Sequence, residues 1–158
     1  MKTDQAEIDL KNNIATLNGN IEYQSLQPAL QAATQRITWY YDSRWIEAIN
    51  TTKLIQPEEN LTLTANIVKF NLDKNEVYLQ EGVYGESNNK ESEIYGDMII
   101  WNTETKNIYG EGNIYYKQQN PELNLRGAKA YGNLGAKNIT VQGDSTQRVV
   151  TNIFPKDN

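Results

Sequence analysis

Apolar residues recur in this chain every 31 positions, and within each repeat they lie two positions apart. The clearest columns of the repeat are Ala6, Ile37, Val68, Ile99 and Ala130; Ile8, Trp39, Phe70, Trp101 and Gly132; and Ala15, Ile46, Val77, Ile108 and Ile139. A period of two is typical of a β-strand with one buried face. Because the residues between the columns are polar or mixed, the pattern predicts strands with one apolar and one polar face.

Polar breaks divide each repeat into two strands. Breaks at 42–44, 73–75, 104–106 and 135–137 predict tight turns, and Asp73-Lys74-Asn75 is a typical hairpin sequence. Longer polar connections follow at 55–60, 87–92 and 118–121. The sequence therefore predicts stacked antiparallel hairpins, with most of one unit followed by four full units at 30–60, 61–91, 92–122 and 123–153.

Two sets of small or polar residues interrupt the apolar pattern at equivalent places in each repeat. They are Gly19, Asn50, Glu81, Gly112 and Gly143, and then Thr34, Ala65, Gly96 and Gly127. Such residues within strands mark bulges or bends. Aligned over the stack, they predict a crease that joins two sheets into a V with an apolar interior. The expected fold class is all-β, with 1–158 forming one domain of repeated hairpins.

The composition narrows the possible functions. The chain has no Cys and no His, which excludes thiol and imidazole chemistry and most zinc sites. Its net charge of −5, without a basic stripe, argues against nucleic-acid binding. The opening residues, MKTDQAEIDL, contain no apolar signal-peptide core. Either the protein is cytosolic, or an export or anchor segment lies outside this sequence.

Two segments carry a resemblance to a known family: LTANIVKFNLDKNEVYLQEGVYGE and IYGDMIIWNTETKNIYGEGNIYYKQ. In each, a small residue and Asn or Asp precede an aromatic residue, a turn and a second apolar strand. Over about 6–145 the chain resembles the OstA-like family, which includes the A and C components of the lipopolysaccharide transport machinery. The resemblance implies a β-jelly-roll, or β-taco, whose interior binds acyl chains and which joins similar domains edge to edge into a periplasmic bridge.

The same resemblance implies the location and partners of the protein. We expect a periplasmic protein. In this family the C component carries an N-terminal membrane helix and the A component a cleavable signal, so the resemblance leaves open whether an anchor at the inner membrane or a signal lies outside this sequence. Its ligand would be lipopolysaccharide or a related glycolipid, and no cofactor or metal is expected. Its protein partners would be other β-taco components or a second copy, bound through edge strands near Ala6–Leu10 and Arg148–Phe154.

The inward apolar columns supply the candidate lipid-binding residues. They are Ile37, Trp39, Ile46, Val68, Phe70, Leu72, Val77, Leu79, Val83, Ile99, Trp101, Ile108, Ile114, Leu125, Ile139 and Val141. Basic residues could meet lipid phosphates at the groove mouth, although the acidic net charge opposes this: Arg36, Lys53, Lys69, Lys117, Arg126, Lys129 and Lys137.

Two other functions fit parts of the pattern. A structural β-solenoid with a closed, dry core would use the same columns as ordinary packing. A carbohydrate-acting β-helix enzyme would need paired acids. The carboxylates, such as Glu58, Glu91 and Glu104, lie mostly in predicted loops or on the polar face, so no catalytic residue is expected.

Overall fold

The computed structural model describes the chain except residues 27–28, 88–90, 121, 147 and 155–158. The described residues form eleven strands and no helix. The strands are β1 (Gln5–Asp9), β2 (Ile14–Leu26), β3 (Ala29–Tyr40), β4 (Trp45–Gln56), β5 (Leu61–Asn71), β6 (Glu76–Ser87), β7 (Ser92–Asn102), β8 (Asn107–Gln119), β9 (Glu122–Asn133), β10 (Asn138–Gln142) and β11 (Val150–Phe154).

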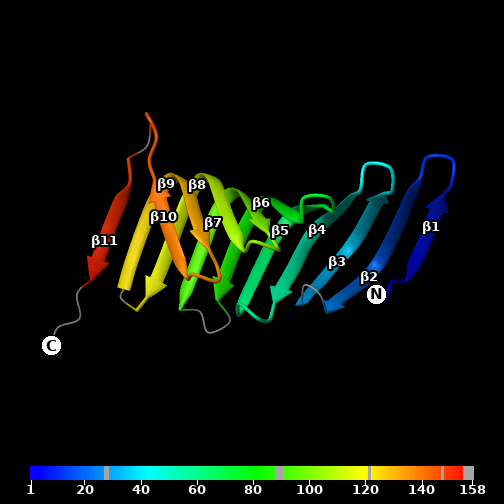
Figure 1. Cartoon of the computed structure of the whole chain (residues 1–158), viewed down its shortest axis with the longest axis horizontal. Coiled ribbons are helices and arrows are strands. Elements are labelled where there is room, and N and C mark those ends of the chain that lie inside the picture. Colours follow the sequence, from blue (N-terminus) through cyan, green and yellow to red (C-terminus); the bar gives the residue numbers. More distant parts are fainter. Residues whose placement is uncertain (27–28, 88–90, 121, 147, 155–158) are drawn as a thin grey trace.

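The strands form one long antiparallel sheet that is not closed into a barrel. Strands β1 to β10 lie side by side in chain order, and β11 pairs with β9 next to β10. The two ends of the chain therefore lie at opposite ends of the stack (Figure 1). This confirms the expected all-β stack of hairpins, but the two halves of the V belong to a single sheet whose strands bend.

The bend is a row of β-bulges at the predicted crease. Register shifts separate Asn18 from Ile21 and recur in every pair from β2–β3 to β8–β9. In the first of the two interrupting sets, positive φ angles occur at Gly19, Asn50, Glu81 and Gly112, with φ of +77° at Gly112 and +69° at Asn50. Glycine adopts this conformation without steric cost and asparagine with little, which explains why they recur at this column.

An Asn or Asp side chain caps several of these bulges. Asp4 Oδ2 accepts a hydrogen bond from the backbone N of Asn20 at 2.9 Å, and Asp97 Oδ2 accepts one from Asn113 Nδ2 at 2.7 Å. Asp97 follows Gly96 in the motif of a small residue and Asn or Asp that the sequence repeats. The motif is therefore a structural signature of the crease: the small residue fits inside the bend and the polar one caps it.

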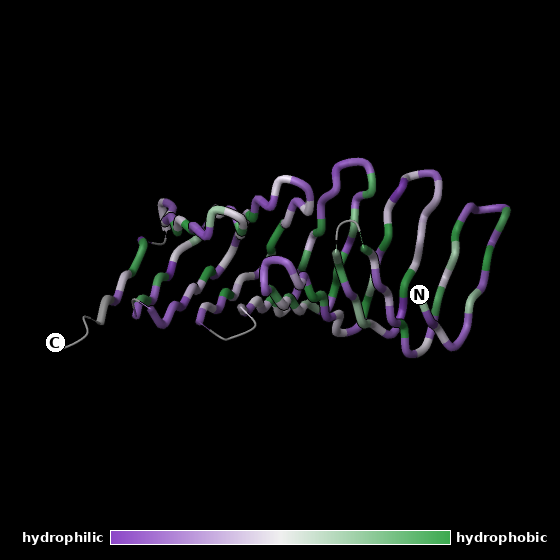
Figure 2. Tube along the Cα trace, turned by 60° about the horizontal axis from the view of Figure 1, so that its bottom comes forward, coloured by the Kyte–Doolittle hydropathy of each residue, from purple (hydrophilic) through white to green (hydrophobic). Residues whose placement is uncertain are grey.

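The tight turns that join β1 to β2, β3 to β4, β5 to β6, β7 to β8 and β9 to β10 stack on one another. We call this border, formed by 10–13, 41–44, 72–75, 103–106 and 134–137, the turn edge. The backbone N of Leu72 donates to the carbonyl of Arg44 at 3.0 Å, and the equivalent bond joins Thr103 to Asn75 at 2.8 Å. Figure 2 shows the successive hairpins side by side, with hydrophilic turns joining the strands that carry the apolar residues.

The last repeat departs from the 31-residue period. Asn107 of β8 and Asn138 of β10 both face Asn133, as the period predicts. Tyr115 and Val150, however, face Arg126 from opposite sides, although they are four residues further apart than one period. The second strand of this unit is thus split into β10 and β11, and Gly143, which was expected at the crease, falls in the connection between them because of this insertion.

Candidate functional site

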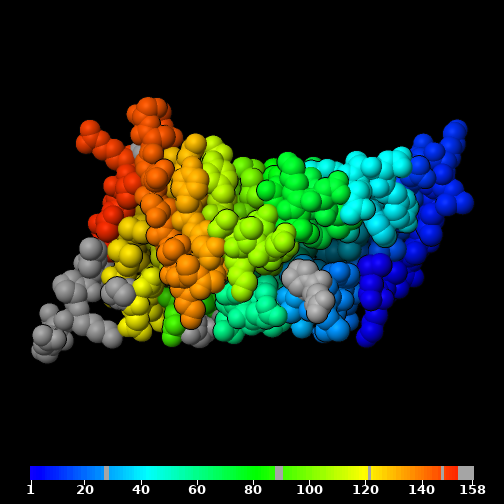
Figure 3. Space-filling model, viewed as in Figure 1, coloured from blue at the N-terminus to red at the C-terminus, as the bar shows by residue number. Residues whose placement is uncertain are grey.

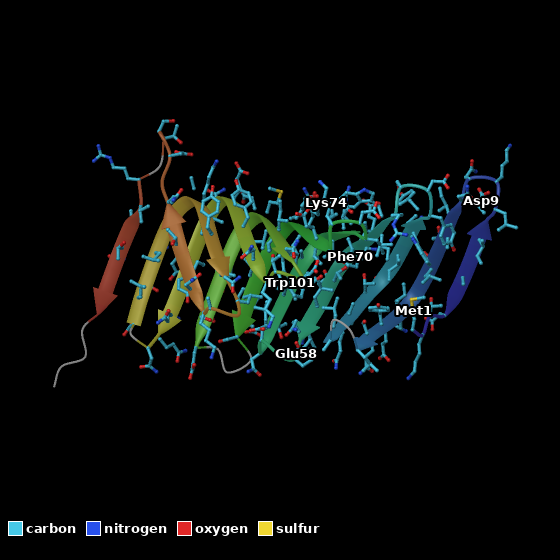
Figure 4. The ribbon with its side chains drawn as sticks, viewed as in Figure 1. Met1, Asp9, Glu58, Phe70, Lys74 and Trp101 are labelled. Carbon is cyan, nitrogen blue, oxygen red and sulfur yellow. The ribbon has the colours of Figure 1, made fainter. Side chains whose placement is uncertain are left out.

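The interior of the V changes from open to closed along the stack. In the column that contains Ile8, Trp39, Phe70 and Trp101, the exposed fraction falls from 61% at Ile8 to 39% at Trp39 and 2% at Trp101, with Phe70 half-buried. Figure 4 shows Phe70 and Trp101 between the turn edge at Lys74 and the opposite border at Glu58. We call β1–β3 the open half and β5–β9 the closed half.

The closed half has a packed apolar core. Leu79, Ile99 and Ala130 are fully buried, and Leu63 and Ile114 are 1% exposed. At the crease, the hydroxyls of Thr34 and Thr52 lie 2.9 Å apart within a hydrogen bond, so the polar atoms at the base of the V are paired. The interior of the closed half is therefore filled by its own apolar side chains.

The candidate lipid-binding residues fall into three groups. Trp39 is exposed. Partly buried are Ile37, Ile46, Phe70, Leu72, Ile108, Leu125, Ile139 and Val141. Buried are Val68, Val77, Leu79, Val83, Ile99, Trp101 and Ile114. Only the first two groups present apolar surface to a ligand without rearrangement of the core, whereas the third forms the packing beneath them.

The closure follows from a progressive curl of the sheet. The turn between β1 and β2 stands at the top of Figure 1, whereas the turn between β9 and β10 lies low, near the loops at the bottom. We call that lower border, which includes 57–60 and 118–120, the loop edge. In Figure 3 the yellow-green turn after β7 lies above the loop that joins β4 to β5.

An ion pair joins the two borders across the mouth of the V. Lys106, in the turn after β7, donates to Glu59 in the loop after β4. The hydrogen bond and the charge of Glu59 raise the pKa of Lys106 above its ordinary value. Glu59 is held in place because its backbone N donates to Gln56 Oε1 at 2.6 Å, and Gln56 is buried.

A pocket of about 430 Å³ lies at this mouth, and we call it the mouth pocket. Its apolar walls come from both borders and include Leu61, Ile94, Ile108, Leu134 and Ile139. Its rim carries carboxylates: Glu58, Glu59, Glu86, Glu91 and Glu93. Sequence reasoning missed this site because the 47-residue separation of Glu59 and Lys106 does not match the repeat; it depends on the curl.

Trp101 adds an unusual feature beside the mouth pocket. In β7 it pairs with Ile108, which lines the pocket, and two strands away its column is continued by Gly132, which also lines it. The Trp101 indole Nε1 is buried and has no hydrogen-bond partner among the described residues. Buried donors are nearly always paired in folded proteins, so this group is an exception that needs a reason.

The basic residues mostly lie away from the mouth. Lys69 pairs with Glu47 at 3.0 Å on the outer face, and the Arg126 guanidinium stacks 4.9 Å from the centre of the Tyr115 ring, also outside. Both positions have outward parity, since their neighbours along the strand face inward. Of the seven expected phosphate-binding residues, only Lys137 lines the mouth pocket, so that expectation is wrong for Lys69 and Arg126.

The outer face of the closed half carries a ladder of tyrosines. Tyr84 and Tyr95 have ring centroids 4.8 Å apart, and Tyr95 and Tyr115 are 5.9 Å apart. Tyr109 donates from its hydroxyl to Glu111 at 2.8 Å, which raises the pKa of Tyr109 to about 12. These contacts stabilise cross-strand pairs and leave the interior as the face available to an apolar ligand.

The inner face of the sheet carries mainly apolar side chains. Within the described residues, no group of three or more acidic side chains is placed to hold a metal ion. None of the described segments is a helix that could cross a membrane.

Both ends of the sheet carry strand edges without a partner strand in the described chain. At one end β1 pairs only with β2, and at the other β10 and β11 pair only with β9. Such edges present backbone N–H and C=O groups to another strand. The expected docking strands are thus at the two ends of the stack.

Neither protein-family models nor curated protein sequences match this chain. Among solved structures, it is similar to LptH from Pseudomonas aeruginosa, described as the LptA-homologous periplasmic component of the lipopolysaccharide transport device. The two share 16% sequence identity and a TM-score of 0.58, over 98% of this chain and 93% of that one. The similarity supports the β-jelly-roll fold expected from the sequence.

Proposed function

We propose that this chain is a non-enzymatic lipid-binding module that carries lipopolysaccharide or a related glycolipid by its acyl chains, as one link of an edge-to-edge periplasmic bridge. The observation that carries the proposal is the column at Ile8 and Trp39, which stays accessible along the open half and continues to the half-buried Phe70 at the start of the closed half. A solenoid that served only as a scaffold would gain nothing from leaving this column uncovered, because exposed apolar surface favours aggregation.

The energetics of such a groove do not require charged contacts. Transfer of one methylene from water to an apolar surface is worth about 0.8 kcal/mol. A single acyl chain covering a few of the exposed side chains would therefore bind measurably. The similarity in fold to LptH, a periplasmic component of a lipopolysaccharide transport device, also supports lipid binding by this chain.

The repeat also predicts how two copies would join. Within the chain, Trp101 faces Val77 on one side and Ile108 on the other. Ile8 belongs to the same column and faces Ala15 on one side only. Continuing the repeat from one copy to the next would place Ile8 opposite Ile139 of β10 and so join the two grooves.

Lipid binding can be tested with a fluorescent fatty acid and the variants Trp39→Glu and Leu17→Glu, both on inner-face columns of the open half. We expect both variants to stay folded and to bind the probe at least about tenfold more weakly, because a carboxylate there would have to be desolvated by the acyl chain. The matched control is Thr38→Glu, at the outward position beside Trp39. A folded wild-type protein that binds neither the fatty acid nor lipopolysaccharide would favour the closed scaffold.

The junction has its own test. Sedimentation of the wild type over a range of concentrations should show association that Ile8→Lys weakens, since the lysine would be buried against Ile139 of the next copy. A strictly monomeric wild type that also ignores any similar β-taco domain would contradict the bridge.

A further inference from the structure

A ladder of side-chain contacts joins successive turns along the turn edge. In each step the last residue of one turn donates a hydrogen bond to the acidic second residue of the next turn. The pairs are Asn13 with Asp42, Arg44 with Asp73, and Asn75 with Glu104. Each donor residue has a φ of +54° or +55°, and this shared backbone conformation directs its side chain towards the next turn.

The ladder stops at the turn between β9 and β10. Lys106 occupies the donor position of the preceding turn, with φ of +64°, but the acceptor position is Gly135, which has no side chain to accept a hydrogen bond. The lysine lies over this glycine, since a Cβ atom at Gly135 would be 3.3 Å from Lys106 Cδ. Lys106 therefore takes no part in the ladder, and its ammonium group reaches the other border, where it donates to Glu59.

Glu59 is well placed to hold this ammonium group. Its side chain is 12% exposed, whereas that of Lys106 is 41% exposed. Its backbone N donates to the side chain of the buried Gln56 at 2.6 Å. A carboxylate with so little exposure is costly to leave without a positive partner. The contact therefore favours the approach of the turn after β7 to the loop after β4 (Figure 3).

The mouth pocket depends on the same approach of the two borders. Leu61 lines it from the start of β5, beside the loop edge, and Leu134 lines it from the turn edge. Both leucines pack with the apolar core of the closed half. If the borders moved apart, a gap would open between these side chains, and their apolar surface would become accessible to a hydrocarbon chain.

We propose that Lys106 and Glu59 form a latch across the mouth of the V, which the lack of an acid at residue 135 makes possible and which limits the entry of a hydrocarbon chain into the mouth pocket. The closed latch holds the two borders together, and its opening exposes the pocket walls. This inference rests on the proposed lipid binding and adds a control of access to it. Because Lys106 is partly exposed, salt weakens the latch.

Distances across the mouth test the latch directly. The chain has no Cys, so spin labels can be attached at Pro57→Cys and Thr105→Cys alone, at exposed positions of the two borders. In the full chain we expect a short distance at low salt that lengthens at high salt. Lys106→Gln should give the long distance at every salt concentration. Gly135→Asp should give an intermediate distance at low salt, because it offers Lys106 the acid that the other turns supply.

Two variants serve as matched controls. Gly135→Asn has the size of aspartate without its charge and should keep the wild-type distance, since a neutral amide competes poorly with a carboxylate for the lysine. Arg44→Gln, at the donor position two repeats before Lys106, weakens a pair of the ladder and should also keep it. Wild-type distances in Lys106→Gln would overturn the latch, and wild-type distances in Gly135→Asp would overturn the role of Gly135.

Uptake of a fluorescent fatty acid then tests what the latch controls. We expect Lys106→Gln to take up the probe faster than the wild type and Gly135→Asn at low salt, with the difference lost at high salt. Equal rates at low salt, in spite of a longer distance in Lys106→Gln, would overturn the control of access and leave lipid binding intact. Failure of every variant to bind the fatty acid or lipopolysaccharide would overturn the proposed function, while the distances would still decide whether the latch exists.

Discussion

The open and closed halves of this protein are built from the same repeat and yet expose their inner faces very differently. Ile8 and Trp101 occupy one column three repeats apart, with Trp39 and Phe70 between them, but Ile8 is 61% exposed and Trp101 is 2% exposed. The side chains are similarly apolar, so hydrophobicity does not cause the difference. The curl of the sheet does, because it brings the turn edge over the loop edge only towards the C-terminal end.

The 31-residue repeat determines the local structure of each hairpin, but it does not determine whether the inner face of that hairpin is covered. Each hairpin forms its turn and its bulge from nearby residues. Whether its inner face is covered depends on the residues that meet across the mouth, such as Glu59 and Lys106. The same apolar column is therefore packing in one half and a candidate binding surface in the other.

The largest predicted contrast is between two charged substitutions on the inner face. Leu79→Lys places a charge at a fully buried position and should destabilise the fold by about 3–5 kcal/mol or abolish it. Trp39→Lys, at a position 39% exposed, should cost about 1 kcal/mol. Urea denaturation followed by circular dichroism measures both. Equal losses would mean that the interior is closed throughout.

Hydrogen exchange should show the same contrast along the backbone. Amides of β5–β8 should be protected most, with protected segments recurring every 31 residues and separated by fast-exchanging turns. Amides of β1 should exchange far faster, since that strand has one partner and exposed side chains. Uniform protection from β1 to β9 would contradict the division into halves.

The ion pair at the mouth should have a smaller effect. Glu59→Gln removes its charge and should lower the denaturation midpoint slightly at low salt and less at high salt, because the Lys106 side chain is 41% exposed. Glu104→Gln, in the same turn as Lys106 but without that contact, is the control. Denaturation midpoints that are equal for the two variants at low salt would show that the pair does not hold the mouth.

The smallest effect concerns the tyrosine ladder outside the closed half. Tyr109 should ionise near pH 12, and Glu111→Gln should return its pKa towards 10, as followed by phenolate absorbance. The folded state holds this proton more tightly than the unfolded state. Its contribution to stability is therefore present below pH 10 and is lost as the pH rises through 12. An unchanged titration curve in the variant would exclude Glu111 as the cause.

Much of the fold could be predicted from the sequence because its determinants are local. The turns, the crease and the inward columns follow from alternation and from Gly, Asn and Asp at fixed places, as Gly112 and Asp97 illustrate. The split of the last strand into β10 and β11 could not be predicted. The four inserted residues near Gly143 lie in a polar stretch, where no apolar position of the 31-residue repeat would reveal the insertion.

The candidate site was only partly predictable, for a physical reason. The apolar side chains were identified correctly as inward, but their accessibility depends on the curl, which accumulates over many strands. For the same reason the mouth pocket, the Glu59–Lys106 pair and the unpaired Trp101 N–H had no signal in the repeat. Contacts that depend on the shape of the whole sheet cannot be predicted from the residues of any one column of the repeat.

The most direct test of the account uses two single-tryptophan variants and a brominated fatty acid that quenches fluorescence on contact. One variant keeps Trp39, on the inner face of the open half, and the other keeps Trp45, on the outer face beside Tyr78. The account predicts strong, saturable quenching of Trp39 and little of Trp45. Equal quenching of both, or none of Trp39 in the folded protein, would contradict an acyl-binding groove in the open half.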